Sequence, residues 1–192
     1  MNNIKIAKTA FPVMDEIKNR WSGRAFDEKQ MSEEELKSLL EAASWAPSAM
    51  NEQPWRYAVA LKQDVEAFNK ILNLLNPSNA VWAKLAGALL FCYTKLSLTA
   101  NGNPNGSAMH DTGLANQNIL LQATNMNLNT HIMGGFDREK ATSEFNLSSD
   151  FKAVCIIAIG YRGIAEDLEE PFKTREQSER TRKNLSEFVT GL

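Results

Sequence analysis

Histidine and cysteine, the side chains that most often bind transition metals, are scarce in this 192-residue sequence. The two histidines, His110 and His131, each lack a second ligand residue three or four positions further on, so a zinc or iron site of the usual type is not expected. Cys92 and Cys155 lie in apolar, strand-like stretches. Lone cysteines in such places are typical of buried thiols in a reducing compartment, and they predict a cytoplasmic protein.

Several common binding signatures are also missing. The sequence contains no glycine pattern of the dinucleotide-binding or P-loop type and no Gly-x-Ser-x-Gly elbow. The net charge of −2 gives no electrostatic footprint for nucleic acid, and no apolar run approaches the roughly 20 residues that span a bilayer. We therefore expect neither a nucleic acid nor a membrane as a partner. If the protein is an enzyme, we expect a bound organic cofactor to supply the reactive group.

Helical and strand-like patterns alternate along the chain, which predicts a single α/β or α+β domain over residues 1–192. The strand-like ranges are 55–61, 88–93, 128–133 and 152–161, and the helical ranges are 10–20, 32–46, 64–75, 80–85 and 108–127. Ser32 and Glu35 form a capping-box pattern. The longest helix is apolar on more than one side, which is typical of burial in a core or between subunits. From about residue 164 to residue 192 we expect an arm that packs on another surface.

Arg20, Ser22 and Arg24 stand at alternate positions around the flexible Gly23. Two planar donor forks and a hydroxyl make a compact anion cradle, in which each charge-assisted bond contributes about 1.5–3 kcal/mol. The pattern indicates a phosphate site, and a solvated basic turn is the alternative with the same composition.

The stretch from Trp45 to Trp55 connects a helix to a strand and contains Pro47 and Pro54. The two prolines restrict the backbone on both sides of a run of small polar residues. A stiff loop with hydroxyl and amide donors suits a flat polar ligand. A helix stop followed by a strand start explains the same residues, so both interpretations stand at this point.

Gly134 and Gly135 follow a predicted strand, where paired glycines let the backbone approach a flat group closely. A plain tight turn before a helix beginning near Asp137 is the alternative. The most loop-like stretch, residues 101–107, is either a mobile cover or a surface turn.

Taken in order, these pieces form a recognisable series. An Arg-x-Ser-x-Arg cradle precedes a capped helix and a Pro-Ser-x-x-Asn-x-Gln-Pro-Trp loop, and Gly-Gly-Phe-Asp, an apolar strand ending in Gly-Tyr and a late Arg-x-Arg follow. Over residues 12–189 this series resembles the FMN-dependent nitroreductase family. The resemblance implies an α+β fold with a central antiparallel sheet flanked by helices. It also implies an intertwined homodimer with two FMN sites at the subunit interface and an arm that crosses to the partner.

The resemblance also assigns roles to residues at matching positions. It implies that Arg20, Ser22 and Arg24 bind the phosphate and ribityl chain of FMN, with Arg180 and Arg182 closing on the same phosphate. The loop residues that would lie on the flavin of the other subunit are Pro47, Ser48, Ala49 and Asn51. Asn79 matches an amide near the pyrimidine edge of the ring, and Gly134 and Gly135 match the backbone beside flavin N5. Asn184 stands where the family often has a proline, which bears on the path of the arm.

The activity implied by the resemblance is that of an FMN-dependent NAD(P)H oxidoreductase. Such enzymes reduce nitroaromatics, quinones or related small electron-poor acceptors by a ping-pong hydride mechanism. No side-chain general acid is evident, so no catalytic residue is expected beyond the flavin. The alternatives are a flavin-binding protein for storage or redox sensing, and a basic-patch binding module without flavin. The stretch at residues 97–110, which would cover the site, carries no motif that identifies the acceptor.

Overall fold

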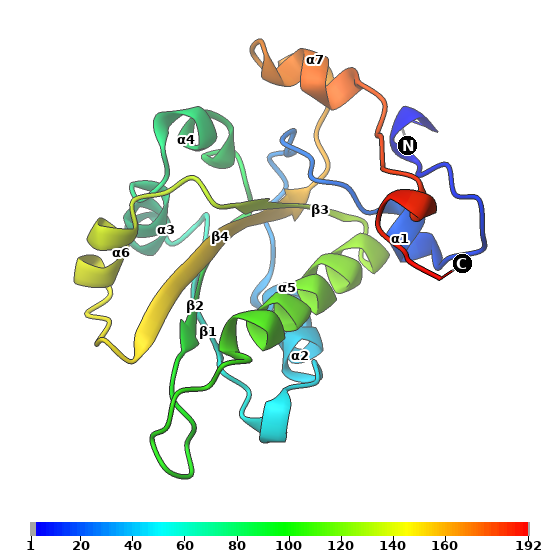
Figure 1. The fold of residues 1–192 in the computed structure, drawn as a ribbon. Helices are drawn as coiled ribbons and strands as arrows, with labels where there is room; N and C mark the ends of the chain where they lie inside the picture. The colour runs from blue at the N-terminus through cyan, green and yellow to red at the C-terminus, as the bar shows by residue number, and fades with distance from the viewer. Residues whose placement is uncertain (1–2, 192) are drawn as a thin grey trace.

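The computed structural model describes residues 3–191 as an α+β fold in which helices flank one antiparallel sheet (Figure 1). The sheet has four strands in the order β1-β2-β4-β3, namely β1 (Trp55–Leu61), β2 (Ala88–Lys95), β3 (Leu128–Met133) and β4 (Phe151–Tyr161). The helices are α1 (Asp15–Asn19), α2 (Glu33–Ser44), α3 (Val65–Leu72), α4 (Pro77–Ala83), α5 (Ala108–Asn125), α6 (Arg138–Glu144) and α7 (Phe172–Gln177). The predicted fold class is confirmed.

The two central strands, β2 and β4, are apolar on both faces because each face of the sheet is covered. Their alternate side chains enter two separate cores. One core takes Leu89, Phe91, Ile156 and Ala158 together with residues of α3, α4 and α6. The other takes Leu90, Cys92, Ile157 and Ile159 together with residues of α2 and α5.

The helix starts follow local signals in the sequence. Ser32 accepts a hydrogen bond from the backbone N–H of Glu35, and the Glu35 carboxylate accepts one from the Ser32 N–H, so the predicted capping box is present. Helix α4 begins earlier than its predicted range of 80–85 because Pro77 occupies its first turn, where its missing N–H costs nothing.

The N-terminal helix is shorter than predicted. The range 10–20 contains only the five residues of α1, because Pro12 disfavours helical geometry at the residue before it. The predicted apolar side of this helix does not enter the core. Phe11 is 65% exposed and Ile17 44% exposed.

The arm after β4 returns to the N-terminal segment of its own chain. The Lys5 ammonium donates to the carbonyl oxygens of Arg175 and Ser178, and one guanidinium nitrogen of Arg180 lies 2.8 Å from the carbonyl oxygens of both Lys5 and Lys18. The first part of the arm therefore packs on residues 3–20. Its crossing to a partner stays a prediction.

Cys92 and Cys155 are opposite each other on β2 and β4 and are buried, free thiols, as predicted. The reducing compartment and the cytoplasmic location stay predictions. Among residues 3–191, no helix combines the length and the hydropathy that crossing a bilayer requires.

Candidate functional site

The cradle segment, residues 20–24, runs along the outer edge of β3, where Ser22 pairs with Thr130 in a parallel bridge. An extended segment places alternate side chains on the same side, so Arg20, Ser22 and Arg24 share one side. Gly23 is required for this close approach. A Cβ at this position would lie 2.1 Å from the side-chain nitrogen of Asn129, which is far inside contact distance. The glycine therefore seats the cradle on the sheet.

Three arginines from the two ends of the chain gather at this cradle. Burial lowers the pKa of the Arg20 guanidinium, and the positive charges of Arg180 and Arg182 lower it further. Arg20 donates to the Ser22 hydroxyl at 3.4 Å. Within residues 3–191, no carboxylate forms a salt bridge with any of the three guanidinium groups. Such an excess of positive charge indicates an anion-binding site. Arg180 and Arg182, predicted to close on the phosphate, thus lie near the predicted cradle.

Arg24 extends away from that cluster. Its guanidinium carbon lies 5.7 Å from the ring centroid of Trp82 and 5.9 Å from that of Phe172. Its backbone N–H donates to the buried carboxylate of Glu176, as does the N–H of Ala25. The cradle backbone is thus held from behind by a side chain that lies 152 positions further along the chain.

His131, on β3, is a further support of the cradle. Its Nδ1 donates to the Gly23 carbonyl oxygen at 3.2 Å, and its ring centroid is 4.6 Å from that of Trp82. Burial, followed by the charge of Arg24, lowers the pKa of His131 to about 4. The imidazole is therefore neutral at physiological pH and adds no charge to the cluster.

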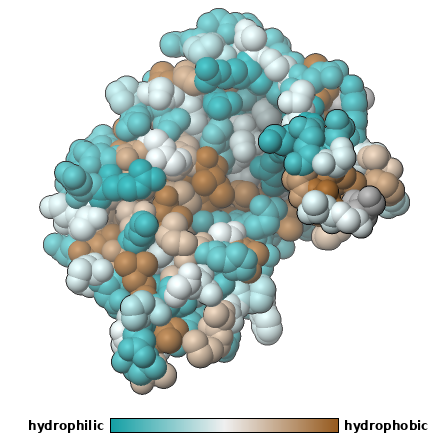
Figure 2. Space-filling view, viewed as in Figure 1, coloured by the Kyte–Doolittle hydropathy of each residue, from teal (hydrophilic) through white to brown (hydrophobic). Residues whose placement is uncertain are grey.

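Asn79 and Gly135 meet at the far end of β3. The side-chain amide of Asn79 donates to the Gly135 carbonyl oxygen at 3.1 Å, and the Asn76 N–H donates to the same oxygen. Asn79 and Trp82 lie one turn apart on α4, and Trp82 contacts both His131 and Arg24. The cradle, Trp82, Asn79 and the glycine pair therefore form one continuous strip, which we call the β3-edge strip. Figure 2 shows exposed hydrophobic residues at the centre of the face that β3 crosses.

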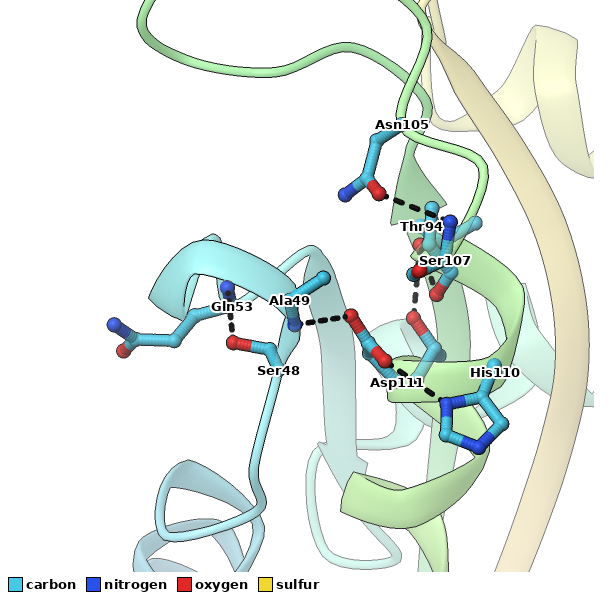
Figure 3. Close-up of polar contacts among 10 residues, drawn as sticks. Ser48, Ala49, Gln53, Thr94, Asn105, Ser107, His110 and Asp111 are labelled. Atoms are coloured by element: carbon cyan, nitrogen blue, oxygen red, sulfur yellow. Dashed lines mark hydrogen bonds and ion pairs between the residues drawn. The ribbon is translucent and has the colours of Figure 1, made fainter.

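The predicted flavin loop is fixed against the start of α5 (Figure 3). The Ala49 N–H donates to the Asp111 carboxylate at 2.9 Å, and the Ser48 hydroxyl accepts from the Gln53 N–H at 3.0 Å. Met50, Asn51 and Gln53 have positive φ angles of 53°, 57° and 48°, which is unusual for residues other than glycine. Such backbone is kept where the surroundings impose it, and it clusters at binding sites.

The loop and the cradle lie at opposite corners of the sheet. The loop leads into β1 at one edge, whereas the cradle pairs with β3 at the other edge. Through the strand register, Trp55 aligns with Lys152 on β4 and Thr130 aligns with Ile159. Seven residues along β4 and three strand spacings put the two corners roughly 25 Å or more apart. Figure 1 shows the same separation, with the loop below α2 and the cradle near α1.

The structure therefore brings together two of the predicted groups and leaves the third apart. Arg20, Ser22, Arg180 and Arg182 join at the cradle, and Asn79, Gly134 and Gly135 join along the same strand. The loop residues Pro47, Ser48, Ala49 and Asn51 stand apart from both within one chain.

Several supporting residues were not predicted. Asp111, Glu176, His131 and Trp82 each act through a partner that is distant in sequence. Only Asp111 carried a local signal, because it is the sole charged residue among Asp, Glu, Lys and Arg in the eighteen residues of α5. A lone carboxylate near the start of an uncharged helix indicates a specific partner, which here is the Ala49 N–H.

Known proteins resemble this chain in sequence and in structure. The Nitroreductase family profile matches residues 17–161. A protein of Archaeoglobus fulgidus, named as a candidate NADH dehydrogenase/NAD(P)H nitroreductase, is 31% identical over 163 residues that cover 80% of this chain and 87% of the relative. The major NAD(P)H-flavin oxidoreductase of Aliivibrio fischeri is 24% identical over 196 residues, which cover 81% of this chain and 90% of the relative. A crystal structure of an oxidoreductase containing FMN matches with a TM-score of 0.91 at 32% identity, covering 99% of this chain and 95% of the other.

Proposed function

The chain belongs to the nitroreductase family, and from this premise we propose that it is an FMN-dependent NAD(P)H oxidoreductase. Its acceptors would be nitroaromatics, quinones or related electron-poor small molecules. One observation carries the proposal above the others. Three guanidinium groups without a carboxylate partner stand at one end of the β3-edge strip, and exposed backbone with an amide stands at its other end.

The residues of the strip suit FMN part by part. Arg20, Arg180 and Arg182 would hold the phosphate dianion, and Ser22 with Arg24 would hold the ribityl chain. FMN supplies the two-electron redox chemistry between NAD(P)H and the acceptor when it is bound. The protein supplies placement and an electrostatic environment that favours negative charge.

Asn79 and the glycine pair would accommodate the ring. A Cβ at Gly134 would meet no atom within 4 Å, and Gly134 has no positive φ, so neither packing nor backbone geometry requires glycine there. An exposed glycine that the fold does not need supports a ligand that lies close to the backbone. The Asn79 amide donates to the Gly135 carbonyl oxygen, so it would stand beside a ligand that lies on the glycine pair.

The separation of loop and cradle supports a homodimer in which each FMN site uses both chains. A mononucleotide is shorter than the distance between the two corners, so one chain cannot present both to the same ligand. Hydrophobic side chains are exposed in both parts of the chain, Phe11 and Met14 in the segment that precedes the cradle and Trp45 and Met50 in the loop stretch. A second copy would cover them.

The dimer is tested by subunit complementation. Arg20→Ala removes a cradle group and Ser48→Arg obstructs the loop, and each variant alone should lose most of its turnover at an FMN concentration that just saturates the wild type. In a randomly mixed population half of the dimers are mixed, and each mixed dimer has one intact site, so about a quarter of wild-type turnover should return. Mixing without any recovery would show that both groups of residues serve a site within one chain.

The activity is tested by absorbance spectroscopy of the FMN-saturated protein without oxygen. NADH or NADPH should bleach the flavin band, and a nitroaromatic or a quinone should restore it. A coloured protein that neither donor bleaches would contradict the oxidoreductase and favour a storage or sensing role. A protein that does not bind FMN would contradict both.

A further inference from the structure

A cavity lies behind the cradle segment. It has a volume of about 420 Å³, within the range of small-molecule pockets, and is bounded by the N-terminal stretch, the start of β3 and residues 162–166. Because side chains of an extended segment alternate, Asn19, Trp21 and Ala25 line this cavity, whereas Arg20, Ser22 and Arg24 do not. The cavity and the cradle therefore lie on opposite sides of the same backbone segment, residues 19–25.

Two polar groups that line the cavity lack partners within residues 3–191. Asn129 is 2% exposed, and its side-chain nitrogen donates to the Ala25 carbonyl oxygen, but its side-chain oxygen is buried without a hydrogen bond. The Nε of Arg162 is likewise buried without an acceptor. Both atoms have almost no accessible surface, so they are packed inside the wall, and a ligand would meet the terminal nitrogens of Arg162 instead.

The charge of Arg162 is also unopposed. Its pKa is lowered by burial, and no salt bridge joins its guanidinium to a carboxylate of the described residues. A half-buried arginine of this kind is a receptor for a carboxylate or a phosphate.

The other ionisable groups on the cavity wall are already engaged. Glu176 accepts from the N–H groups of Arg24 and Ala25, and Glu166 accepts from the side chain of Gln177. The Lys5 ammonium donates to two carbonyl oxygens and lies 4.6 Å from the Trp21 ring centroid. A ligand in the cavity therefore meets one positive charge without a partner, that of Arg162.

We propose that this cavity binds a small organic monocarboxylate with an apolar body. Its carboxylate accepts from the terminal nitrogens of Arg162. Trp21, Ile6 and Ile164 supply the apolar walls. One guanidinium suits a monoanion, and a phosphate dianion would find better partners in the cradle. This site is separate from the proposed FMN site and requires no redox step.

The test is isothermal titration of FMN-saturated protein with 4-hydroxybenzoate, benzoate and the neutral benzyl alcohol. We expect saturable binding of 4-hydroxybenzoate and of benzoate, and at least tenfold weaker binding of benzyl alcohol, which has no carboxylate. Arg162→Gln should raise the dissociation constant of 4-hydroxybenzoate at least tenfold. Lys37→Gln, which removes an exposed charge on α2, should change that constant less than twofold.

A second variant addresses the cavity without altering charge. Ala165→Phe should fill the space and abolish binding, while circular dichroism and the melting temperature show that the fold is retained. The same Arg162 dependence should appear in FMN-free protein, which separates this site from the flavin. The proposal is overturned if 4-hydroxybenzoate gives no saturable heat at millimolar concentration, or if Arg162→Gln binds it as tightly as the wild type.

Discussion

The cradle and the loop would serve the same ligand, yet they are built in opposite ways. The cradle is rich in positive charge and is seated by buried groups behind it, namely Glu176, His131 and Asn129. The loop at residues 47–53 carries no cation and is held by one carboxylate, one hydroxyl and a strained backbone. The difference indicates that the cradle recognises charge whereas the loop recognises shape. Four changes test this division, from the largest expected effect to the smallest.

Gly23→Ala tests how tightly the cradle is seated. The added methyl group would overlap the buried Asn129 amide and break its bond to Ala25, so we expect a loss of about 3 kcal/mol or more in the free energy of unfolding. Gly113→Ala is the matched control. A Cβ at Gly113, on α5, would meet nothing, and the change should stabilise the protein by roughly 0.5–1 kcal/mol. Denaturant unfolding of both variants gives the comparison, and equal effects would contradict the assigned role of Gly23.

The neutral state of His131 should appear in the pH dependence of stability. The folded-state pKa of about 4 lies below the usual value of 6.5, so the unfolded chain binds the proton first. The resulting stability is present above about pH 6.5 and is lost as the pH falls toward 4, by up to about 3 kcal/mol.

Unfolding curves of wild type and His131→Phe between these pH values isolate this contribution from that of the carboxylates. The difference between the two proteins should change with pH. A constant difference would show that His131 has an ordinary pKa in the folded protein.

Arg20→Ala tests charge recognition directly. Losing one charge-assisted contact should weaken FMN binding by about 1.5–3 kcal/mol, or roughly 10- to 150-fold in the dissociation constant. Lys37→Ala removes an exposed charge elsewhere and should leave FMN affinity unchanged. Fluorescence titration of FMN measures both, and an affinity of Arg20→Ala within threefold of the wild type would reject its place in the cradle.

Asp111→Asn tests the loop with the smallest change. It removes the charge that strengthens the bond to the Ala49 N–H, and we expect a loss of about 1 kcal/mol in stability. FMN affinity should fall less than in Arg20→Ala, and acceptor turnover should fall more than FMN affinity. The division between charge and shape would be broken if Asp111→Asn lost as much FMN affinity as Arg20→Ala.

Local patterns sufficed for much of the fold and for the chemistry of the cradle. The capping box at Ser32 and the apolar runs of β2 and β4 depend on neighbours in the chain, so their prediction needed no tertiary contact. The α1 prediction failed where apolar spacing was given more weight than the proline at position 12.

What the sequence could not reveal were the contacts between distant residues. Glu176 reaches Arg24 across 152 positions and Asp111 reaches Ala49 across 62, and no local pattern encodes either pairing. The positive φ angle of Met50 was also hidden, since a methionine side chain disfavours that backbone.

The alternation of side chains along residues 19–25 has a consequence for energetics. A single strand of backbone separates the anion cradle from the cavity that contains Arg162, and Glu176 is bonded to that same backbone. Thermodynamic linkage then demands symmetry: a carboxylate that changes the FMN affinity by some factor must have its own affinity changed by FMN by the same factor. One pair of titrations, each ligand in the absence and presence of the other, measures the coupling free energy between the two sites.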